Sequence, residues 1–202
     1  TRKGVFKQFL IFLDRFIVWN ATHILIDGES QRQFLITNGI VKEPNSYVLG
    51  KGSISGVDTK RFVPNKHIRL NVRNDLGIRE NEIVFMFLGR MNHDKGIAEL
   101  ATAFNRLQLK YSYIRLLLVG GDEENMTPII IKKVKNIATV LFYGVTKEPE
   151  KILQACDVFC LPSHREGFGT SIIEASLLEK PIVCSDTYGL METIVENETG
   201  LR

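Results

Sequence analysis

From residue 81 onward, short apolar segments alternate with segments of helical periodicity, and this alternation constrains the fold more than any other feature. Continuously apolar strands must be buried on both faces, and strands that are joined by helices run parallel. The sequence therefore predicts an α/β fold: a parallel sheet with helices on both faces. The expected strands are 83–88, 115–119, 140–143, 158–161 and 181–184, and the expected helices are 97–107, 128–136, 149–155, 170–179 and 191–196.

The first 80 residues follow a less regular pattern. We expect strands at 23–26 and 47–49, separated by a helix at 30–38. The Gly-rich segment 50–58 lacks the glycine spacing of a dinucleotide fingerprint, and no apolar-periodic helix follows it, so a dinucleotide site is disfavoured. The predicted regions are 1–58 (the tail of a preceding domain and its crossover), 59–80 (a linker) and 81–202 (a second domain, incomplete at its C-terminus).

Residues 5–19 are rich in Phe, Leu, Ile and Val, but the segment is too short and too often interrupted by charges to span a bilayer. We expect a helix, and two interpretations of it stay open. It packs against a domain outside this chain, or it lies along a membrane surface with Trp19 at the boundary. In the second interpretation, the basic residues near lipid phosphates are Arg2, Lys3, Lys7 and Arg15.

Composition narrows the classes of function. The 202 residues are 44% hydrophobic, which is enough to bury a core, and the net charge of +3 comes from interspersed acids and bases without a nucleic-acid footprint. Cys156, Cys160 and Cys184 lie on or beside apolar segments, which favours core thiols in a reducing compartment over disulfides. With no evident signal peptide and no initial Met, we expect a fragment of a cytoplasmic protein, with peripheral contact at the inner face of the membrane as the alternative.

Polar residues and glycines collect after the expected strands, which is where parallel sheets bind ligands. The segments concerned are 89–90, 120–122, 144, 163–169 and 185–186. The longest of them leads into the helix expected at 170. The amides of Gly169, Thr170 and Ser171 would then lie at a helix N-terminus, which favours an anion such as a phosphate.

Two carboxylates flank this loop: Glu166 lies on it, and Glu174 lies one turn into the helix. Alternatives remain for both. Ser171 and Glu174 have the spacing of a capping box, and Glu166 would be unremarkable as a solvated loop residue. Two carboxylates alone also allow a glycoside hydrolase, but a carboxylate beside a phosphate-type loop fits a nucleotide better.

Arg90 and Lys95 bracket a second joint between a strand, a loop and a helix. The helix dipole disfavours Lys95 at a helix start, unless the side chain is solvated or a bound anion is present. Arginine binds phosphate through two hydrogen bonds, and lysine acts as a point charge. The chain contains no Asp-x-Asp sequence, and no Cys has zinc-site spacing with a His, so we expect neither a metal nor a cofactor.

Glu166 and Glu174, separated by seven residues with Gly-Phe-Gly directly after the first, resemble the signature of retaining glycosyltransferases of the GT-B type, family four (glycosyl transferases group 1). The resemblance extends over nearly the whole chain. It includes the segments 88–90, 95–96, 118–121, 142–144 and 189–192. It implies the C-terminal, Rossmann-like half of a GT-B fold, truncated, and the Gly-rich segment 50–58 looks most like bacterial enzymes that extend capsular or lipid-linked glycans.

The resemblance also implies roles for individual residues. It makes Glu166 the catalytic residue and Glu174 the ligand of the donor ribose. The remaining implied contacts are to the donor diphosphate (Arg90, Lys95, Gly169, Thr170 and Ser171), to the donor sugar (Glu166, Gly167 and Phe168) and to the base (Tyr143, Gly144 and Val145). His164 is either a donor contact or a surface residue. Glu192 either tethers its loop or is an ordinary acid in the first turn of a helix.

The function implied is transfer of a sugar from a nucleotide donor, UDP being favoured, to a glycan or lipid-linked acceptor with retention of anomeric configuration. We expect this fragment to supply the donor site, to bind nucleotide weakly and to be inactive by itself. A nucleotide-sugar epimerase of the same architecture and a non-catalytic nucleotide-binding module remain as alternatives. Product analysis separates the epimerase, and substitution of the two glutamates separates the module.

Overall fold

Six parallel strands form the central sheet. The structure, a computed structural model, describes residues 4–202 apart from the side chain of Val5, so Arg2 and Lys3 lie outside it. The strand order is β5-β4-β3-β6-β7-β8, and every neighbouring pair is parallel. The strands are β3 Ile83–Leu88, β4 Ile114–Val119, β5 Val140–Gly144, β6 Val158–Leu161, β7 Ile182–Cys184 and β8 Gly200–Leu201. The predicted α/β fold is confirmed.

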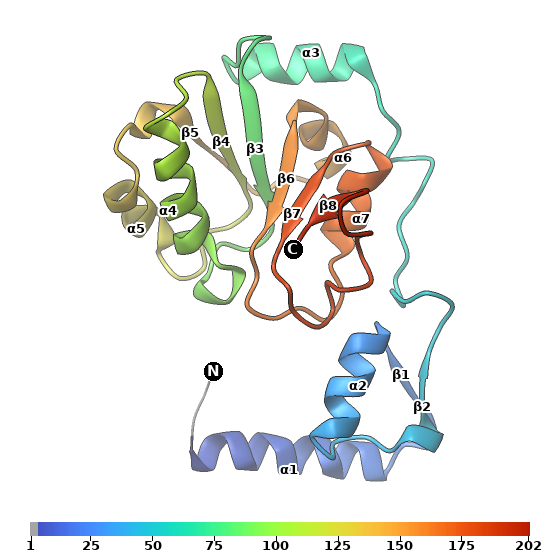
Figure 1. Ribbon diagram of the computed structural model, residues 1–202. Helices are drawn as coiled ribbons and strands as arrows, with labels where there is room; N and C mark the ends of the chain where they lie inside the picture. Colours follow the sequence, from blue (N-terminus) through green and yellow to red (C-terminus); the bar gives the residue numbers. More distant parts are fainter. Residues whose placement is uncertain (1–3) are drawn as a thin grey trace.

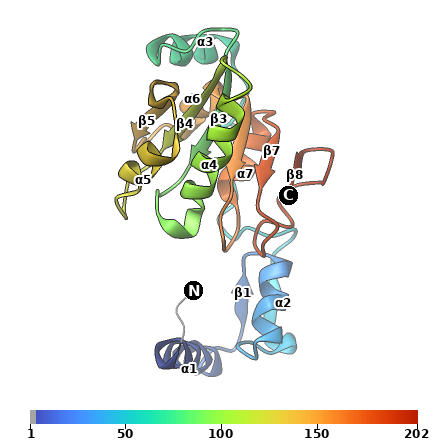
Figure 2. The same cartoon turned by 60° about the vertical axis from the view of Figure 1, so that its left-hand side comes forward.

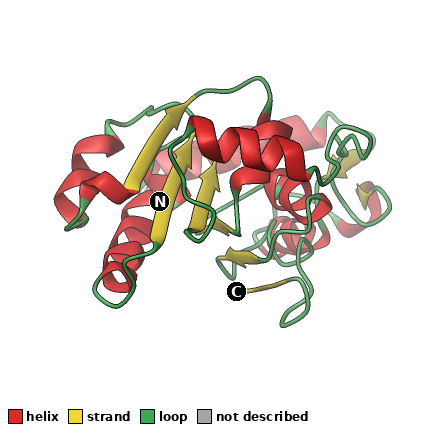
Figure 3. Ribbon diagram, turned by 90° about the horizontal axis from the view of Figure 1, so that it is seen from above, coloured by secondary structure: helices red, strands yellow, loops and turns green. Residues whose placement is uncertain are grey.

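Helices cover both faces of this sheet (Figures 1 and 3). Those after β3 and β4 pack against each other on one face, and those before and after β6 lie on the other (Figure 2). The α-helices are α3 Lys66–Asp75, α4 Ile97–Gln108, α5 Met126–Lys133, α6 Pro149–Ile152 and α7 Thr170–Leu177, and the 3₁₀ turns are η1 Glu43–Asn45, η2 His93–Lys95, η3 Ile137–Thr139 and η4 Leu153–Ala155. In α4, Ile97, Leu100, Ala101 and Phe104 are buried, a spacing of three or four residues that turns one stripe to the core.

The interior of the sheet is apolar, as the strand sequences require. Met86, Phe87, Leu117 and Phe159 are fully buried, and each such side chain contributes about 1.5–3 kcal/mol relative to an exposed position. The three cysteines are free and buried, as expected of core thiols. Burial raises the pKa of Cys160 to about 12.

We call residues 4–58 the first half of the chain and residues 59–202 the second half. The elements of the first half lie below the carboxyl ends of the strands in Figure 1. They are α1 Val5–Trp19, β1 Ile24–Ile26, α2 Glu29–Thr37 and β2 Ser46–Val48, with β1 and β2 parallel. α1 exposes Phe9, Phe12, Phe16 and Trp19, a surface compatible with both interpretations of this helix. Arg15 donates from Nε to the Gly39 carbonyl over 2.9 Å, so its guanidinium is turned toward the end of α2. Within residues 4–202, no helix has the length and hydrophobicity needed to cross a bilayer.

Two segments differ from the prediction. The linker expected at 59–80 contains α3, whose N-cap Asn65 accepts hydrogen bonds from the His67 and Ile68 amides. The helix expected at 191–196 is wrong: the chain forms successive turns there. The Thr193 hydroxyl donates to the Leu190 carbonyl, and the Thr199 hydroxyl accepts from the Val195 amide. These local side-chain bonds compete with helical ones.

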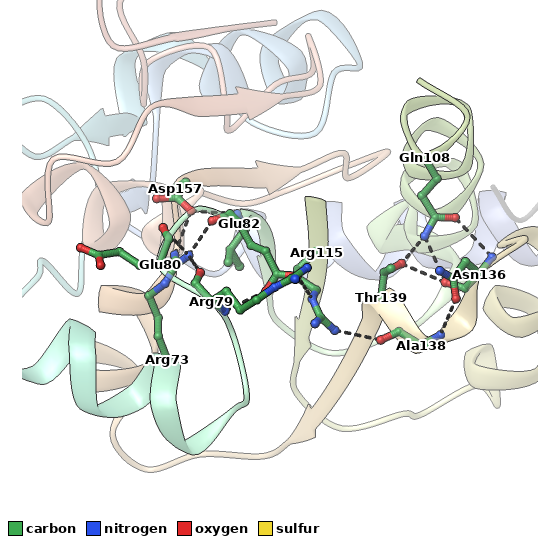
Figure 4. Close-up of polar contacts among 11 residues, drawn as sticks. Arg73, Arg79, Glu80, Glu82, Gln108, Arg115, Asn136, Ala138, Thr139 and Asp157 are labelled. Atoms are coloured by element: carbon green, nitrogen blue, oxygen red, sulfur yellow. Dashed lines mark hydrogen bonds and ion pairs between the residues drawn. The ribbon is translucent and has the colours of Figure 1, made fainter. Parts of the chain in front are cut away.

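Helix α3 is tied to the amino-terminal edge of the sheet by Asp157. Its carboxylate accepts from Arg69 Nη2 at 2.5 Å and from Arg73 Nη1 at 3.0 Å, and it also accepts from the Val84 amide at 2.8 Å. Arg73 is buried and donates further to the Glu82 carbonyl (Figure 4). This edge lies opposite the carboxyl ends of the strands, so the cluster stabilises the scaffold without taking part in a site there.

Glu82 occupies the same edge (Figure 4). Its carboxylate accepts from the Arg79 amide at 2.8 Å, from Arg79 Nη2 at 3.0 Å and from Arg115 Nε at 2.9 Å. Burial opposes ionisation of Glu82, but these hydrogen bonds outweigh it and lower the pKa of the carboxyl to about 2.

We predict that Glu82→Gln lowers the free energy of unfolding at pH 7 by about 3 kcal/mol, because it removes one member of a buried ionic cluster. The unfolded carboxyl, with a pKa near 4.5, binds its proton before the folded one does. The wild-type protein therefore loses this contribution as the pH falls from 4.5 toward 2. Urea unfolding at pH 7 and at pH 3 should give a smaller difference between the two proteins at pH 3.

The matched control is Glu80→Gln, because the Glu80 side chain is exposed and points away from the cluster in Figure 4. It should leave the unfolding free energy unchanged at both pH values. An E82Q penalty that is equal at pH 7 and pH 3 would contradict the assignment.

Candidate functional site

A cavity of about 490 Å³ opens at the carboxyl ends of β3, β4 and β6. Strand order changes direction at β3, which pairs with β4 on one side and β6 on the other, and open α/β sheets bind ligands at such a switch point. The last residues of the three strands, Leu88, Val119 and Leu161, line the cavity. The residues that follow these strands line it too, and they include Arg90, Lys95, Glu166 and Glu174.

Lys95 and Glu166 form an ion pair in the cavity wall. Lys95 Nζ lies 2.5 Å from Glu166 Oε1, and the hydroxyl of the buried Ser163 donates to the same oxygen over 2.7 Å. The Lys95 and Glu166 side chains are only 18% and 12% exposed. The sequence allowed each of these side chains to be freely solvated, and neither is. The positive charge of Lys95 at the helix start is balanced by the carboxylate of Glu166 from the loop after β6.

The backbone around Gly96 brings this pair together. The Asn92 side chain accepts from the Lys95 amide over 3.2 Å and caps the turn η2. Gly96 follows with φ of 66°, and a Cβ there would lie 2.0 Å from the Pro162 carbonyl oxygen. Only glycine allows this approach of the two loops. Arg165 and Asp94 add a second ion pair between the same loops, at 2.5 Å.

Helix α7 begins at the cavity, and its N-cap is Gly169 without a side-chain cap. The capping box considered from the sequence is therefore absent. Ser171 lies inside the helix, and within the described residues the Glu174 carboxylate accepts no hydrogen bond from a protein group. The three amides expected to face an anion are not equivalent. The Gly169 amide donates to Gly189 and the Thr170 amide to Phe168, whereas the Ser171 amide has no acceptor among residues 4–202.

Glu174 faces the cavity from the first turns of α7. Burial raises the pKa of this carboxyl, and Glu150 adds to the shift, while Arg61 opposes it. A partly buried carboxylate without a hydrogen-bond donor in the described part of the chain is a costly arrangement. It suits a group that accepts hydrogen bonds from a ligand.

Arg90 lies at the cavity rim and is 68% exposed, with Nη1 3.2 Å from Glu123 Oε2. Of the expected base contacts, only Val145 lines the cavity. The Gly144 carbonyl accepts from the Gly120 amide over 2.8 Å, and Tyr143 is 40% exposed outside the lining. The sequence did not identify Thr146 and Pro149, which line this wall, because a polar residue and a proline after a strand carry no distinctive signal.

The remaining expected residues divide between the cavity and its surroundings. Phe168 lines the cavity, whereas Gly167 faces the first half of the chain, where a Cβ would lie 3.6 Å from Asp27 Oδ2. His164 is a surface residue, with Nε2 3.4 Å from Glu99 Oε1. Glu192 is a tether, since its carboxylate accepts from the Ser30 hydroxyl over 2.8 Å.

Within the described residues, no group of three or more His, Cys, Asp or Glu side chains is placed to hold a metal ion. The cationic groups at the cavity are the side chains of Arg90 and Lys95. A site with these cations, a free helix amide and an unpaired carboxylate can bind a phosphorylated ligand that also carries hydroxyl groups.

A family model for glycosyl transferases group 1 matches residues 69–202. The chain belongs to this family, and its architecture is that of GT-B glycosyltransferases, as the sequence indicated. Its similarity to a capsular polysaccharide biosynthesis glycosyltransferase, CapM of Staphylococcus aureus, is 33% identity over 99% of this chain and 53% of that protein.

A Campylobacter jejuni transferase that is named for an undecaprenol-diphosphate-linked acceptor is 31% identical over 90% of this chain and 46% of its own length. Among solved structures, Anabaena Alr3699/HepE in complex with UDP-glucose superimposes with a TM-score of 0.82 at 21% identity, covering 96% of this chain and 54% of that one. The chain thus spans about half the length of the relatives it matches.

We predict that Glu174→Gln leaves the free energy of unfolding at pH 7 unchanged or raises it by about 0.5–1 kcal/mol, because it removes a partly buried charge that has no hydrogen-bond donor. The raised pKa implies that the wild-type protein loses stability relative to this variant as the pH rises through the carboxyl's titration. Thermal unfolding of the wild-type protein and of E174Q over a range of pH tests this dependence. The control is Glu198→Gln, at an exposed position. A loss of about 1 kcal/mol in E174Q would instead support a capping role.

Proposed function

We propose that this chain supplies the donor half of a retaining glycosyltransferase that transfers a sugar from a UDP-sugar to a glycan or lipid-linked acceptor. The observation that carries the proposal is the convergence of Lys95, Glu166, Glu174 and the start of α7 on one cavity. The UDP complexes of a structural relative support the donor class. The capsular and undecaprenol-linked relatives support the acceptor class.

In this proposal, the donor diphosphate lies between Lys95 and the start of α7. Its ligands there are the free Ser171 amide, with the Thr170 and Ser171 hydroxyls as further donors, and Arg90 reaches it from the rim. When the bond between the sugar carbon and the phosphate oxygen breaks, negative charge grows on the β-phosphate, and preorganised donors stabilise it. The acceptor oxygen then forms the new bond to that carbon, and its proton passes to the departing β-phosphate oxygen.

Glu174 accepts hydrogen bonds from the two ribose hydroxyls, and these would give its partly buried carboxylate the donors that it lacks among residues 4–202. Glu166 contacts the transferred sugar and is the proposed catalytic residue. One of its oxygens is held by Lys95 and Ser163, which fixes the carboxylate and leaves the other oxygen for the substrate. The base lies along Val145, Thr146 and Pro149. Because the chain spans about half of its relatives, we propose that it binds nucleotide weakly and does not turn over alone.

We predict that UDP binds this chain and that Lys95→Met weakens the binding about tenfold or more, because the variant loses a charge-assisted contact to the diphosphate. Titration calorimetry with UDP, UMP and uridine should give affinities in that order. The matched control is Lys110→Met, which removes an equal charge from an exposed position distant from the cavity lining.

Two outcomes would contradict the proposal. One is UDP binding that is as tight in K95M as in the wild-type chain. The other is a wild-type chain that binds none of the three ligands while remaining folded by circular dichroism.

A further inference from the structure

The start of α2 is capped by a side chain from the other half of the chain. Its N-cap, Gly28, provides no side-chain cap. Glu192, from the loop after β7, accepts hydrogen bonds from both the Ser30 amide and the Ser30 hydroxyl. A carboxylate at a helix N-terminus is favoured by the helix dipole. A Cβ on Gly28 would lie 3.2 Å from Glu192 Oε1, so glycine at this position leaves room for the carboxylate.

Ser30 also reaches the backbone of the Glu192 loop. Its hydroxyl accepts from the Gly189 amide over 2.9 Å while donating to Glu192. The Gly189 carbonyl in turn accepts from the Gly169 amide over 3.0 Å, and Gly169 is the N-cap of α7. A continuous chain of hydrogen bonds therefore runs from Glu192 through Ser30 and Gly189 to the helix start that faces the cavity.

Gly189 also supports the loop that carries Glu166. It has φ of 78°, and a Cβ there would lie 2.4 Å from the Glu166 carbonyl oxygen and 2.6 Å from the Gly167 carbonyl oxygen. The backbone at Gly189 thus lies directly against the loop, and a displacement of Gly189 would move it. The position of Gly189 is set from the first half of the chain by Ser30.

Two apolar contacts accompany this polar chain. Phe168 lies against the first half of the chain, where a Cβ on Gly52 would meet its ring at 2.5 Å and a Cβ on Gly28 would meet it at 3.4 Å. The rings of Phe34 and Tyr188 stack with their centroids 4.4 Å apart. In Figures 1 and 2, α2 begins at the end of the first half that is nearest the sheet.

We infer that Ser30 and Glu192 are positioning residues that hold the cavity loop 163–169 and the start of α7 from the first half of the chain. Neither residue lines the cavity, and both act through Gly189. The consequence is that the order of the donor loop depends on contact between the two halves, so that donor binding and this contact favour each other. Only the coupling to donor binding rests on the proposed function; the positioning role does not.

The experiment uses the whole 202-residue chain and two readouts. Amide hydrogen exchange without nucleotide measures the order of residues 163–171, and UDP titration measures the coupling to the donor site. The variants are Ser30→Ala and Glu192→Gln, with Ser30→Thr retaining the hydroxyl. The control is Glu29→Gln, an exposed acid next to Ser30 whose carboxylate pairs with Arg32 and Gln33 of the same helix.

We expect exchange in residues 163–171 to rise about tenfold or more in S30A, which loses the hydroxyl that bonds both Glu192 and Gly189. E192Q removes the charge that strengthens the bonds from Ser30, so exchange should also rise about tenfold there. UDP affinity should fall by a similar factor in both variants. S30T and E29Q should behave as the wild-type chain. If S30A or E192Q does not fold, Gly28→Ala provides the same test. The added methyl group crowds the Glu192 carboxylate without removing a hydrogen-bond donor, so exchange in residues 163–171 should rise.

Unchanged exchange in folded S30A and E192Q would overturn the inference, whatever the result with UDP. Raised exchange with unchanged UDP affinity would overturn the coupling and keep the positioning role. Failure of the wild-type chain to bind UDP would count against the proposed function alone, because the exchange experiment contains no nucleotide.

Discussion

The pairing of β3 with β4 on one side and β6 on the other determines where every functional group of this chain lies. Parallel strands end at the same edge of the sheet, and at this point two neighbouring connections leave in opposite directions. The loop after β3 brings Lys95, and the loop after β6 brings Glu166, so residues 71 positions apart form one ion pair. The cluster around Asp157 and Glu82 stabilises the opposite edge, which leaves the carboxyl ends free for a ligand.

The fold was predictable because its signals are local. The apolar segments 83–88 and 158–161 match β3 and β6 residue for residue. The helix expected at 191–196 failed because threonine hydroxyls at both ends bond the backbone in turns, an effect that hydrophobic periodicity does not register. Helix α3 was missed because its inner face uses Arg69 and Arg73, which a search for apolar spacing treats as solvent-exposed.

The residues that line the cavity were predictable only in part. The sequence brought Arg90, Lys95, Glu166 and Glu174 to one pocket, and the cavity contains all four. Which side chains form pairs, and which acceptor each backbone amide donates to, depend on three-dimensional contacts. The sequence could not reveal that the Gly169 amide is already engaged by Gly189, or that Glu192 caps a helix more than 160 residues away. The Glu192 contact connects the two halves of the chain, so we infer that the order of the proposed donor site depends on both.

The central claim is that a nucleotide diphosphate binds between Lys95 and the start of α7. Amide chemical shifts recorded during a UDP titration of the isotopically labelled chain test it most directly. We expect the largest shift at Ser171, whose amide is free within residues 4–202, and smaller shifts at Gly169 and Thr170, whose amides donate to Gly189 and Phe168. Shifts that cluster elsewhere, with Ser171 unchanged at saturating UDP, would contradict it.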